Sequence, residues 1–319
     1  MQKAQESRHC KIFSSLKTVL YLFLLLIALR ITYYALSDGF CLQRIENPFS
    51  KGIYELSKPT EEELLELKNV CTNSFTYLGK GSQAYAFQSQ DGAYVLKLFK
   101  CYHLKPVTWL EEMQLFGFLE DYKKSQLERR SKKTNHTLKS YQLAHDLIAE
   151  ECGLIFLQIV PSSYFHQEVQ ITDKIGRTHT IDLAKHGFIL QKKGDLLFPK
   201  FEHWIKEKKL KKAKKLIQSL VSLIVSRSVK GVQDQDPDLH KNAGCIGTQA
   251  LFIDVGGFHF KEEAKKPEVY VHDVRKITNK LAVWLKDKSP ELANFLDETI
   301  AQIDLQAELK TNMACQETN

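Results

Sequence analysis

Four aspartates and one asparagine in the second half of the chain have the types and spacing of a site that handles a metal ion and a phosphate. Asp234, Asp236 and Asp238 fall within five positions, and Asn242 follows in the same stretch. Asp254 comes directly after a short apolar run and is followed by a valine and two glycines. Carboxylate and amide oxygens are the ligands that Mg²⁺ prefers, often together with substrate phosphates. The pattern therefore predicts a cation-binding loop, since three such close acids raise one another's pKa unless a cation compensates. The alternative interpretation is a turn without chemistry.

A glycine-rich turn and an isolated lysine lie earlier in the chain. The alternating apolar runs around them, with the Asp91-Gly92 turn, predict three antiparallel strands, which cover residues 75–78, 84–87 and 93–99. Gly79 and Gly81 lie between the first two strands, and Lys97 lies among apolar residues of the third. A dinucleotide-binding loop would need a helix directly after the glycines, and a Walker loop would need GxxxxGK followed by Ser or Thr. The sequence meets neither condition.

These motifs resemble those of the protein-kinase-like superfamily. The stretch from Leu78 to Phe87, followed by Val95-Leu96-Lys97, is similar to its glycine-rich loop and strand lysine. The later order of helix acid, long helix, acidic loop, asparagine, apolar strand and Asp-x-Gly is also similar to that family's order. The resemblance implies an α+β, bilobal fold with a β-rich N-lobe and a helical C-lobe. It also implies an ATP- and Mg²⁺-dependent phosphotransferase.

The resemblance also implies roles for particular residues. The turn at Gly79 and Gly81 would cover the nucleotide phosphates, and Lys97 would orient them. Asn242 and Asp254 would hold the metal. The segment Gln191-Lys-Lys-Gly194-Asp195 would link the lobes and offer backbone groups to the adenine.

The family's lysine pairs with a glutamate on a helix, and two residues of this chain compete for that role. A helix is predicted over residues 140–152, and Glu151 projects into its apolar face. Glu151 is therefore the expected partner of Lys97, while Asp146 is the alternative because it lies nearer the middle of the helix.

The acidic loop departs from the family pattern. Asp234-Gln235-Asp236 stands where the family has His-Arg-Asp, and Asp236 precedes Asn242 by six positions where the family has five. Asp236 is the expected catalytic base that takes the proton of the acceptor hydroxyl. Asp234 and Asp238 remain alternatives, since Asp238 precedes Asn242 by four positions.

The substrate and the alternative functions follow from what surrounds these motifs. No convincing Ala-Pro-Glu motif follows Gly257, so a small molecule, lipid or glycan is favoured over a protein, in the style of small-molecule or lipopolysaccharide kinases. The altered loop also fits a pseudokinase that binds nucleotide or protein without turnover. A third possibility is a membrane protein whose soluble part only mimics these spacings.

Nucleic acid is not an expected partner. The lysines of the helix predicted over 201–229 lie on the solvent-exposed face of a helical pattern whose other face is apolar.

The N-terminal region predicts a membrane anchor. A basic tail over residues 1–17 precedes an apolar stretch over 18–36 that is interrupted only by Arg30. Its length is close to the ~20 residues needed to cross a bilayer as a helix. A cleaved signal peptide is the alternative, although no small-x-small cleavage site follows. The basic tail favours a cytoplasmic N-terminus with the remainder across the membrane, whereas the need for ATP favours the kinase-like domain on the cytoplasmic face. The side of the membrane is therefore left open.

The rest of the chain divides by composition. The predicted parts are a turn-rich linker over 37–59, an N-lobe over 60–194 with a helical insertion over 102–139, a helical C-lobe over 195–310 and a tail over 311–319. The seven cysteines form no CxxC pair, so buried free thiols are expected rather than a zinc site or a disulfide framework.

Overall fold

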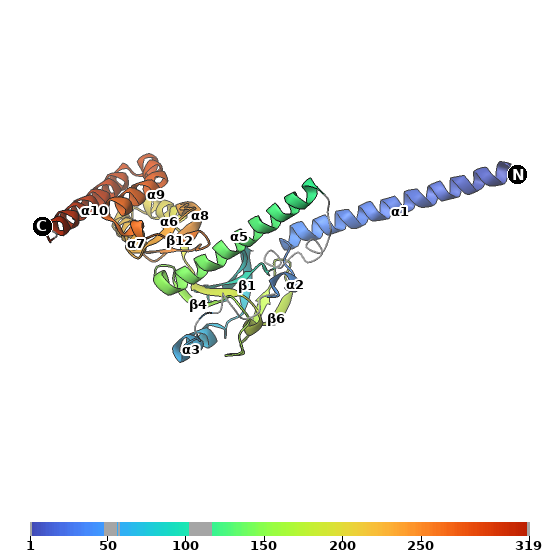
Figure 1. Cartoon of the computed structure of the whole chain (residues 1–319), viewed down its shortest axis with the longest axis horizontal. Helices are drawn as coiled ribbons and strands as arrows, with labels where there is room; N and C mark the ends of the chain where they lie inside the picture. Colours follow the sequence, from blue (N-terminus) through green and yellow to red (C-terminus); the bar gives the residue numbers. More distant parts are fainter. Residues whose placement is uncertain (1, 48–55, 57, 102–116, 318–319) are drawn as a thin grey trace.

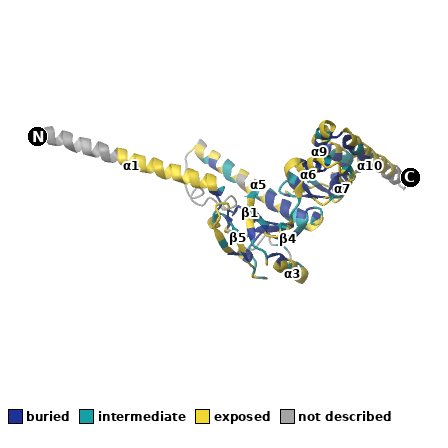
Figure 2. Ribbon diagram, turned by 180° about the vertical axis from the view of Figure 1, so that it is seen from behind, coloured by how far each residue is buried: buried dark blue, intermediate teal, exposed yellow. Residues whose placement is uncertain are grey.

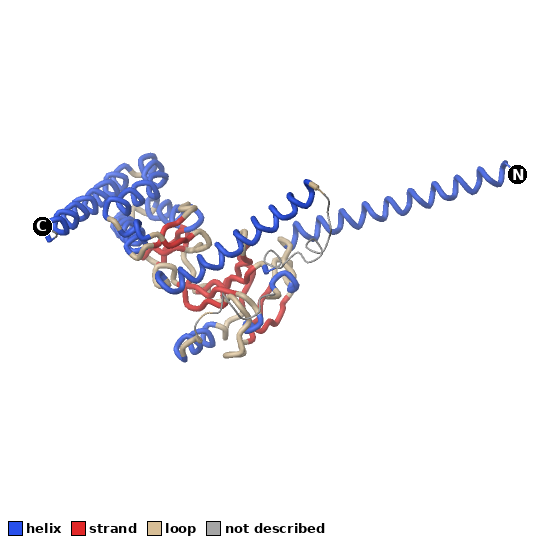
Figure 3. The backbone as a smooth tube through the Cα atoms, in the orientation of Figure 1, coloured by secondary structure: helices blue, strands red, loops and turns tan. Residues whose placement is uncertain are grey.

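The computed structural model describes residues 2–47, 56, 58–101 and 117–317 of the chain (Figure 1). A long helix, α1 (Gln2–Ser37), projects from a strand-rich N-lobe, and a mainly helical C-lobe lies at the opposite end of the molecule (Figures 1 and 3). The predicted α+β class with a β-rich N-lobe and a helical C-lobe is confirmed. This arrangement is consistent with a bilobal kinase-like fold.

The N-lobe is built on a curled seven-stranded sheet. Its strand order is β4-β7-β3-β2-β1-β5-β6, antiparallel except where β1 and β5 pair in parallel. The predicted three-stranded meander is confirmed. The strands are β1 (Phe75–Lys80), β2 (Ala84–Ser89), β3 (Tyr94–Phe99), β4 (Leu154–Gln158), β5 (Glu168–Thr172), β6 (Thr178–Asp182) and β7 (Phe188–Lys192).

Two helices pack around this sheet. Helix α3 (Glu61–Val70) begins at Thr60, whose side chain accepts a hydrogen bond from the backbone N–H of Glu63 while the Glu63 carboxylate caps Thr60 in return. Helix α5 (Phe118–Ile148) is continuous, so the expected insertion and the helix predicted to start at residue 140 are one element. The first part of the expected insertion, 102–116, lies outside the described residues.

The C-lobe packs its helices around α7, with small two- and three-stranded sheets at the boundary between the lobes. The helix predicted over 201–229 is interrupted at Lys208, whose φ of 55° cannot continue a right-handed helix. The helices are α6 (Leu197–Lys206), α7 (Leu210–Val229), α8 (Leu239–Asn242), α9 (Pro267–Lys288) and α10 (Pro290–Glu317). The boundary strands are β8 (Asp195–Leu196), β9 (Val232–Asp234), β10 (Ala243–Ile246), β11 (Gln249–Phe252) and β12 (Phe258–Phe260).

The segment after α1 is part of the N-lobe rather than a simple linker. Phe40 and Ile45 are fully buried in the N-lobe core, and the short helix α2 (Leu42–Ile45) lies between the sheet and α1. Burying two large apolar side chains removes them from water at a gain of roughly 1.5–3 kcal/mol each. The start of the predicted linker is therefore fixed to the domain by the hydrophobic effect.

Helix α1 is long and apolar enough over Lys17–Ser37 to cross a membrane. Figure 2 shows that the described part of this helix is exposed along its length, up to the point where it meets the N-lobe. At that point Asp38 accepts hydrogen bonds from Lys174 and Tyr77, both at 3.0 Å, and pairs with Lys80 at 3.2 Å. The end of α1 is thus tied to the sheet by charge as well as by apolar packing.

The junction can be tested by replacing Asp38 with asparagine. We expect the free energy of unfolding to fall by about 1 kcal/mol at neutral pH, since two lysines lose their counter-charge. The hydrogen bond from Lys174, helped by Lys80 and Tyr77, lowers the pKa of Asp38 below its ordinary value of 3.8. Such a carboxylate stabilises the fold above its unfolded pKa and loses that contribution as the pH falls through its folded pKa.

The measurement is denaturant unfolding of the full-length chain in detergent micelles at about pH 7, 5 and 3. The difference between parent and variant should shrink on acidification. The exposed Asp287, which pairs only with its neighbour Lys288, provides the matched control Asp287→Asn. A difference that does not change with pH would contradict the assigned ion pair.

Candidate active site

A cavity of about 460 Å³ lies between the N-lobe sheet and the boundary strands of the C-lobe, and we call it the front cavity. Lys97 of β3 and Asp254 both line it, so the structure brings these two predicted site residues together. The segment from Gln191 to Leu196, which includes the expected link between the lobes, forms another wall. The remaining lining residues are Leu78, Ala86, Val95, Lys241 and Ile253.

Lys97 is one of four lysines that line the front cavity, and it is the one that faces Asp254. Its ammonium group donates a hydrogen bond to the backbone carbonyl of Ile253, the residue directly before Asp254. Burial lowers the pKa of Lys97, while the negative charge of Asp254 acts in the opposite direction. The β3 strand delivers this side chain because Lys97 pairs with Ala86 on one side and with Ile189 on the other, in the middle of the sheet.

Asn242 and Asp254 are adjacent because of the hairpin between β10 and β11. Ala243 pairs with Phe252 in that hairpin, and the backbone N–H of Ile253 donates to the Asn242 carbonyl at 2.9 Å. The Asn242 side-chain amide donates to the Asp236 carbonyl at 2.7 Å, which leaves its own oxygen for another partner. Asp254 is exposed, and one carboxylate oxygen accepts from the Gly256 N–H at 3.1 Å.

This pair fits the ligand chemistry of Mg²⁺, which takes oxygen ligands and often only one or two carboxylates from the protein. Within the described residues, no group of three histidine, cysteine or acidic side chains is placed to hold a metal ion. The protein oxygens of Asn242 and Asp254 would therefore need other ligands, such as phosphate or water oxygens, to complete an octahedral shell.

The three acids of the loop have different surroundings. Asp234 ends β9, its side chain is 5 % exposed, and the guanidinium of Arg227 is 3.8 Å away. Burial raises the pKa of Asp234, and the charges of Asp236 and Asp254 raise it further, as predicted for close acids. Asp238 caps α8 by accepting from the His240 N–H at 3.2 Å, whereas Asp236 is exposed to solvent.

The glycines around the site fall into two groups. A Cβ on Gly257 would lie 2.8 Å from a carboxylate oxygen of Asp234, so packing inside the protein requires glycine there. A Cβ on Gly79 would meet nothing within 4 Å, and one on Gly81 would meet only the Ala84 carbonyl at 3.9 Å. The packing of the protein alone thus explains Gly257 but not the glycines of the turn.

Glu151 does not contact Lys97, which corrects the expected pair. Helix α5 ends at Ile148, and the following turn directs the Glu151 carboxylate to α7 of the C-lobe. There it accepts from Ser226 at 2.7 Å and pairs with Lys230 at 2.5 Å. The alternative, Asp146, is exposed and contacts its neighbour His145. Neither acid is therefore the partner of the half-buried lysine.

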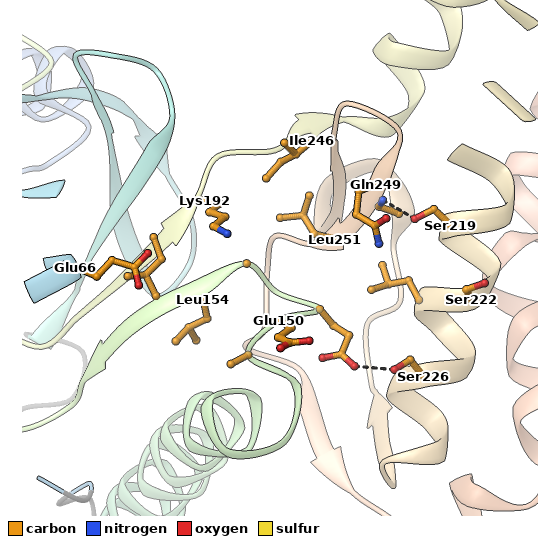
Figure 4. A pocket seen from close by; sticks show the side chains of 16 residues that line it. Glu66, Glu150, Leu154, Lys192, Ser219, Ser222, Ser226, Ile246, Gln249 and Leu251 are labelled. Atoms are coloured by element: carbon orange, nitrogen blue, oxygen red, sulfur yellow. Dashed lines mark hydrogen bonds between the residues drawn. The ribbon is translucent and has the colours of Figure 1, made fainter. Parts of the chain in front are cut away.

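Glu151 lines a second cavity of about 730 Å³, the back cavity, which is bounded by residues of both lobes (Figure 4). Figure 4 shows Ser219, Ser222 and Ser226 of α7 facing it from one side, with Lys192 and Glu66 on the other. Burial alone would raise the pKa of Glu151, but the hydrogen bonds from Lys230 and Ser226 outweigh it and lower the pKa. Glu151 therefore forms a charged contact that connects the two lobes.

Ser140 and Tyr141 of α5 were not predicted, although they reach the site. Ser140 contacts the backbone directly after Asp254, and Tyr141 contacts Gln83 at the end of the glycine turn. Serine and tyrosine in a helix have no distinctive spacing, so only their position on the face of α5 toward the cavity could have identified them.

The strand-rich N-lobe and the helical C-lobe are consistent with a bilobal kinase-like fold. No protein-family model and no curated protein matches the chain. Among solved structures it is similar to WbdD, with a TM-score of 0.32, 15 % identity and coverage of 70 % of this chain and 43 % of that chain. A second structure, described as the bifunctional kinase-methyltransferase WbdD, gives 0.31, 14 %, 69 % and 42 %. The chain spans less than half the length of these proteins.

The contact that Glu151 makes between the lobes can be tested with Glu151→Gln. We expect the free energy of unfolding to fall by about 1–2 kcal/mol, because the charged hydrogen bonds to Lys230 and Ser226 become neutral. Denaturant unfolding of the full-length chain measures this change. Glu150→Gln is the control, since Glu150 is an exposed neighbour that lines the same cavity. If Glu151→Gln leaves the stability unchanged and the pKa of Lys97 in the parent protein is raised, the expected pairing of Glu151 with Lys97 would be supported instead.

Proposed function

We propose that the chain is a membrane-anchored, ATP- and Mg²⁺-dependent phosphotransferase that acts on a hydroxyl group. The observation that carries this proposal is the front cavity, in which a half-buried lysine faces Asp254 with Asn242 beside it. Phosphoryl transfer requires charge neutralisation and alignment more than covalent chemistry by the protein. A cation on one wall and oxygen ligands on the other supply both.

The shape and lining of the front cavity support a nucleotide as its occupant. Its volume of about 460 Å³ lies within the range of small-molecule sites, and its lining combines apolar side chains with four lysines, which suit an anionic ligand. Gly79 and Gly81 have open space where a side chain would be, so a phosphate could approach the backbone of the turn closely. Lys97 would then exchange the carbonyl of Ile253 for phosphate oxygens.

Asn242 and Asp254 would hold the metal, which would neutralise charge on the phosphates when bound. Both residues present an oxygen that the protein leaves available, and the β10–β11 hairpin keeps them adjacent. Asp236 would act on the acceptor hydroxyl. It is the exposed acid of the loop, whereas Asp234 is buried beside Arg227 and Asp238 caps a helix.

The acceptor would be a small molecule, lipid or glycan, and α1 would be a single membrane span. The Lys17–Ser37 stretch has the length and hydropathy for that role. ATP is a cytosolic metabolite, so the kinase-like domain would face the cytoplasm. The described contacts of Asp38 would then place the N-lobe next to the bilayer.

A pseudokinase is the second candidate, and one observation favours it. Neither Glu151 nor Asp146 pairs with Lys97, so the ion pair implied by the resemblance is missing among the described contacts. A binding module could tolerate that loss because it needs the nucleotide site but not the alignment for transfer.

The nucleotide site can be tested by thermal unfolding of the full-length chain in detergent micelles with ATP and Mg²⁺. A ligand present at 100 times its Kd stabilises the folded state by about 2.7 kcal/mol. We expect Asp254→Asn to lose the Mg²⁺-dependent part of this stabilisation and Lys97→Met to lose most of it. Asp146→Asn, on the exposed side of α5, is the control. No stabilisation of the parent protein would contradict both candidate functions.

The assignment of the base can be tested with Asp236→Asn. Loss of a general base lowers turnover by about 10²- to 10⁴-fold. We expect this loss in phosphate transfer to a panel of sugar, lipid and small-molecule alcohols, with unchanged stabilisation by Mg²⁺ and ATP. Asp238→Asn is the matched control, which should alter the cap of α8 but keep turnover within a few-fold. Nucleotide binding without turnover on the whole panel would favour the pseudokinase instead.

A further inference from the structure

Helix α5 contributes no acid to the front cavity among the described residues that line it, yet it contacts both the end of the glycine turn and the segment after Asp254. Two adjacent residues, Ser140 and Tyr141, make these contacts. Ser140 is fully buried, and Tyr141 is 5 % exposed. Their hydrogen bonds lead to the segment after Asp254 and to the end of the glycine turn.

Ser140 fixes the segment that follows the metal-binding aspartate. Its hydroxyl donates to the backbone carbonyl of Val255 and accepts from the backbone N–H of Phe258 at 2.7 Å. These partners lie on either side of the glycine pair Gly256-Gly257. One buried hydroxyl therefore sets the path of the chain directly after Asp254, and a buried polar group with both functions satisfied holds a single geometry.

Tyr141 fixes the end of the glycine turn. Its hydroxyl donates to the side-chain oxygen of Gln83 at 2.6 Å, and the Gln83 amide donates in turn to Thr137 at 3.2 Å. The tyrosine ring stacks on Phe99 of the sheet with centroids 4.8 Å apart. Burial raises the pKa of Tyr141, and the nearby charge of Asp254 raises it further, so the hydroxyl keeps its proton and remains a donor.

The two contacts meet at Gly256. A Cβ on Gly256 would overlap the side-chain amide of Gln83, so the end of the glycine turn lies directly against the backbone after Asp254. The turn, helix α5 and the Asp254 segment therefore form one packed unit. In the protein-kinase-like superfamily that the sequence resembles, a lysine–acid pair links the helix to the site. The described hydrogen bond of Lys97 goes to a backbone carbonyl instead of an acid.

We propose that Ser140 and Tyr141 are positioning residues, which align the glycine turn and Asp254 through neutral hydrogen bonds in place of that ion pair. Neither residue lines the front cavity, so they act through Gln83 and through the backbone of Val255 and Phe258. This inference rests on the proposed phosphotransfer function and specifies how the glycine turn and Asp254 are kept aligned in its site.

The test uses Tyr141→Phe and Ser140→Ala in the full-length chain in detergent micelles. Hydrolysis of ATP with Mg²⁺ serves as the readout, because water replaces the unidentified acceptor. Losing one neutral hydrogen bond that aligns the site should lower kcat about five- to tenfold. The KM for ATP and the thermal stabilisation by ATP should stay within about twofold of the parent values, since neither side chain lines the cavity.

Tyr77→Phe is the matched control. It also removes one tyrosine hydroxyl from a hydrogen bond in the N-lobe, the one to Asp38 at 3.0 Å, away from the cavity lining. It should leave kcat unchanged. Combining Tyr141→Phe with Gln83→Met should lower kcat no further than either change alone, because both act through one bond.

Three kinetic results would overturn the proposal. They are an unchanged kcat, an effect confined to KM, and a kcat that rises because the contacts restrain the turn in an inactive position. Amide hydrogen exchange gives a readout without activity: exchange at residues 255–258 should quicken in Ser140→Ala, and at residues 79–83 in Tyr141→Phe. If the parent neither binds nor hydrolyses ATP, the proposed function fails. Unchanged exchange rates in both variants would by themselves contradict the positioning role.

Discussion

A half-buried ammonium group needs a compensating partner, and the way in which Lys97 meets this requirement shapes the boundary between the lobes. Removing a charge from water costs several kcal/mol unless polar groups replace the water. Lys97 meets the carbonyl of Ile253 and the charge of Asp254, both supplied by the chain beyond β11. The sheet of the N-lobe and the hairpin of the C-lobe are therefore joined at the point where the proposed nucleotide phosphates would lie. Phosphate oxygens could replace the carbonyl without leaving the cation unpaired.

A second charged contact holds the lobes together on the opposite side of this boundary. Glu151 joins the turn after α5 to Ser226 and Lys230 of α7, and its backbone carbonyl accepts from the Phe252 N–H at 2.8 Å. Lys192 borders both cavities. Leu251 borders the back cavity and Ile253 borders the front cavity, so the two cavities meet along this part of the boundary between the lobes.

The floor of the site is held by a buried ion pair with aromatic neighbours. Arg227 of α7 is 1 % exposed, and its guanidinium lies over the rings of Phe252 and Phe258 at 5.1 and 5.8 Å. Asp234 is its charged neighbour, and the raised pKa of Asp234 reflects how little water reaches this pair. Gly257 packs against Asp234, so the loop acids and the Asp254 segment share one rigid support. Asp236 projects from this support into solvent, which is where an acceptor would approach.

Local patterns in the sequence were sufficient for the strands, the α+β class and the apolar N-terminal helix, because each depends on the period of nearby side chains. Alternation placed Lys97 in a strand, and the apolar run before Asp254 predicted a second short strand, which is β11. Five cysteines have side chains that the structure describes, and these five are free, four of them buried, as expected for packed thiols. The sequence alone also identified Asn242 and Asp254 as neighbours in function, although their contact is made by the β10–β11 register.

Other features depended on contacts between distant segments. Glu151 shares a face with the apolar residues of α5 only if the helix continues through it, but the helix ends at Ile148 and the carboxylate finds Lys230 instead. The exposure of Asp236, the burial of Asp234 and the capping role of Asp238 follow from how the loop packs on Arg227 and α8. Ser140 and Tyr141 gain their importance only when α5 lies against the glycine turn. The sequence by itself determined the strands, the α+β class and the apolar N-terminal helix, because residue type and local period encode them. The tertiary structure decided which of the candidate site residues meet, because pairing energies depend on burial and distance, and neither is set by neighbours in the chain.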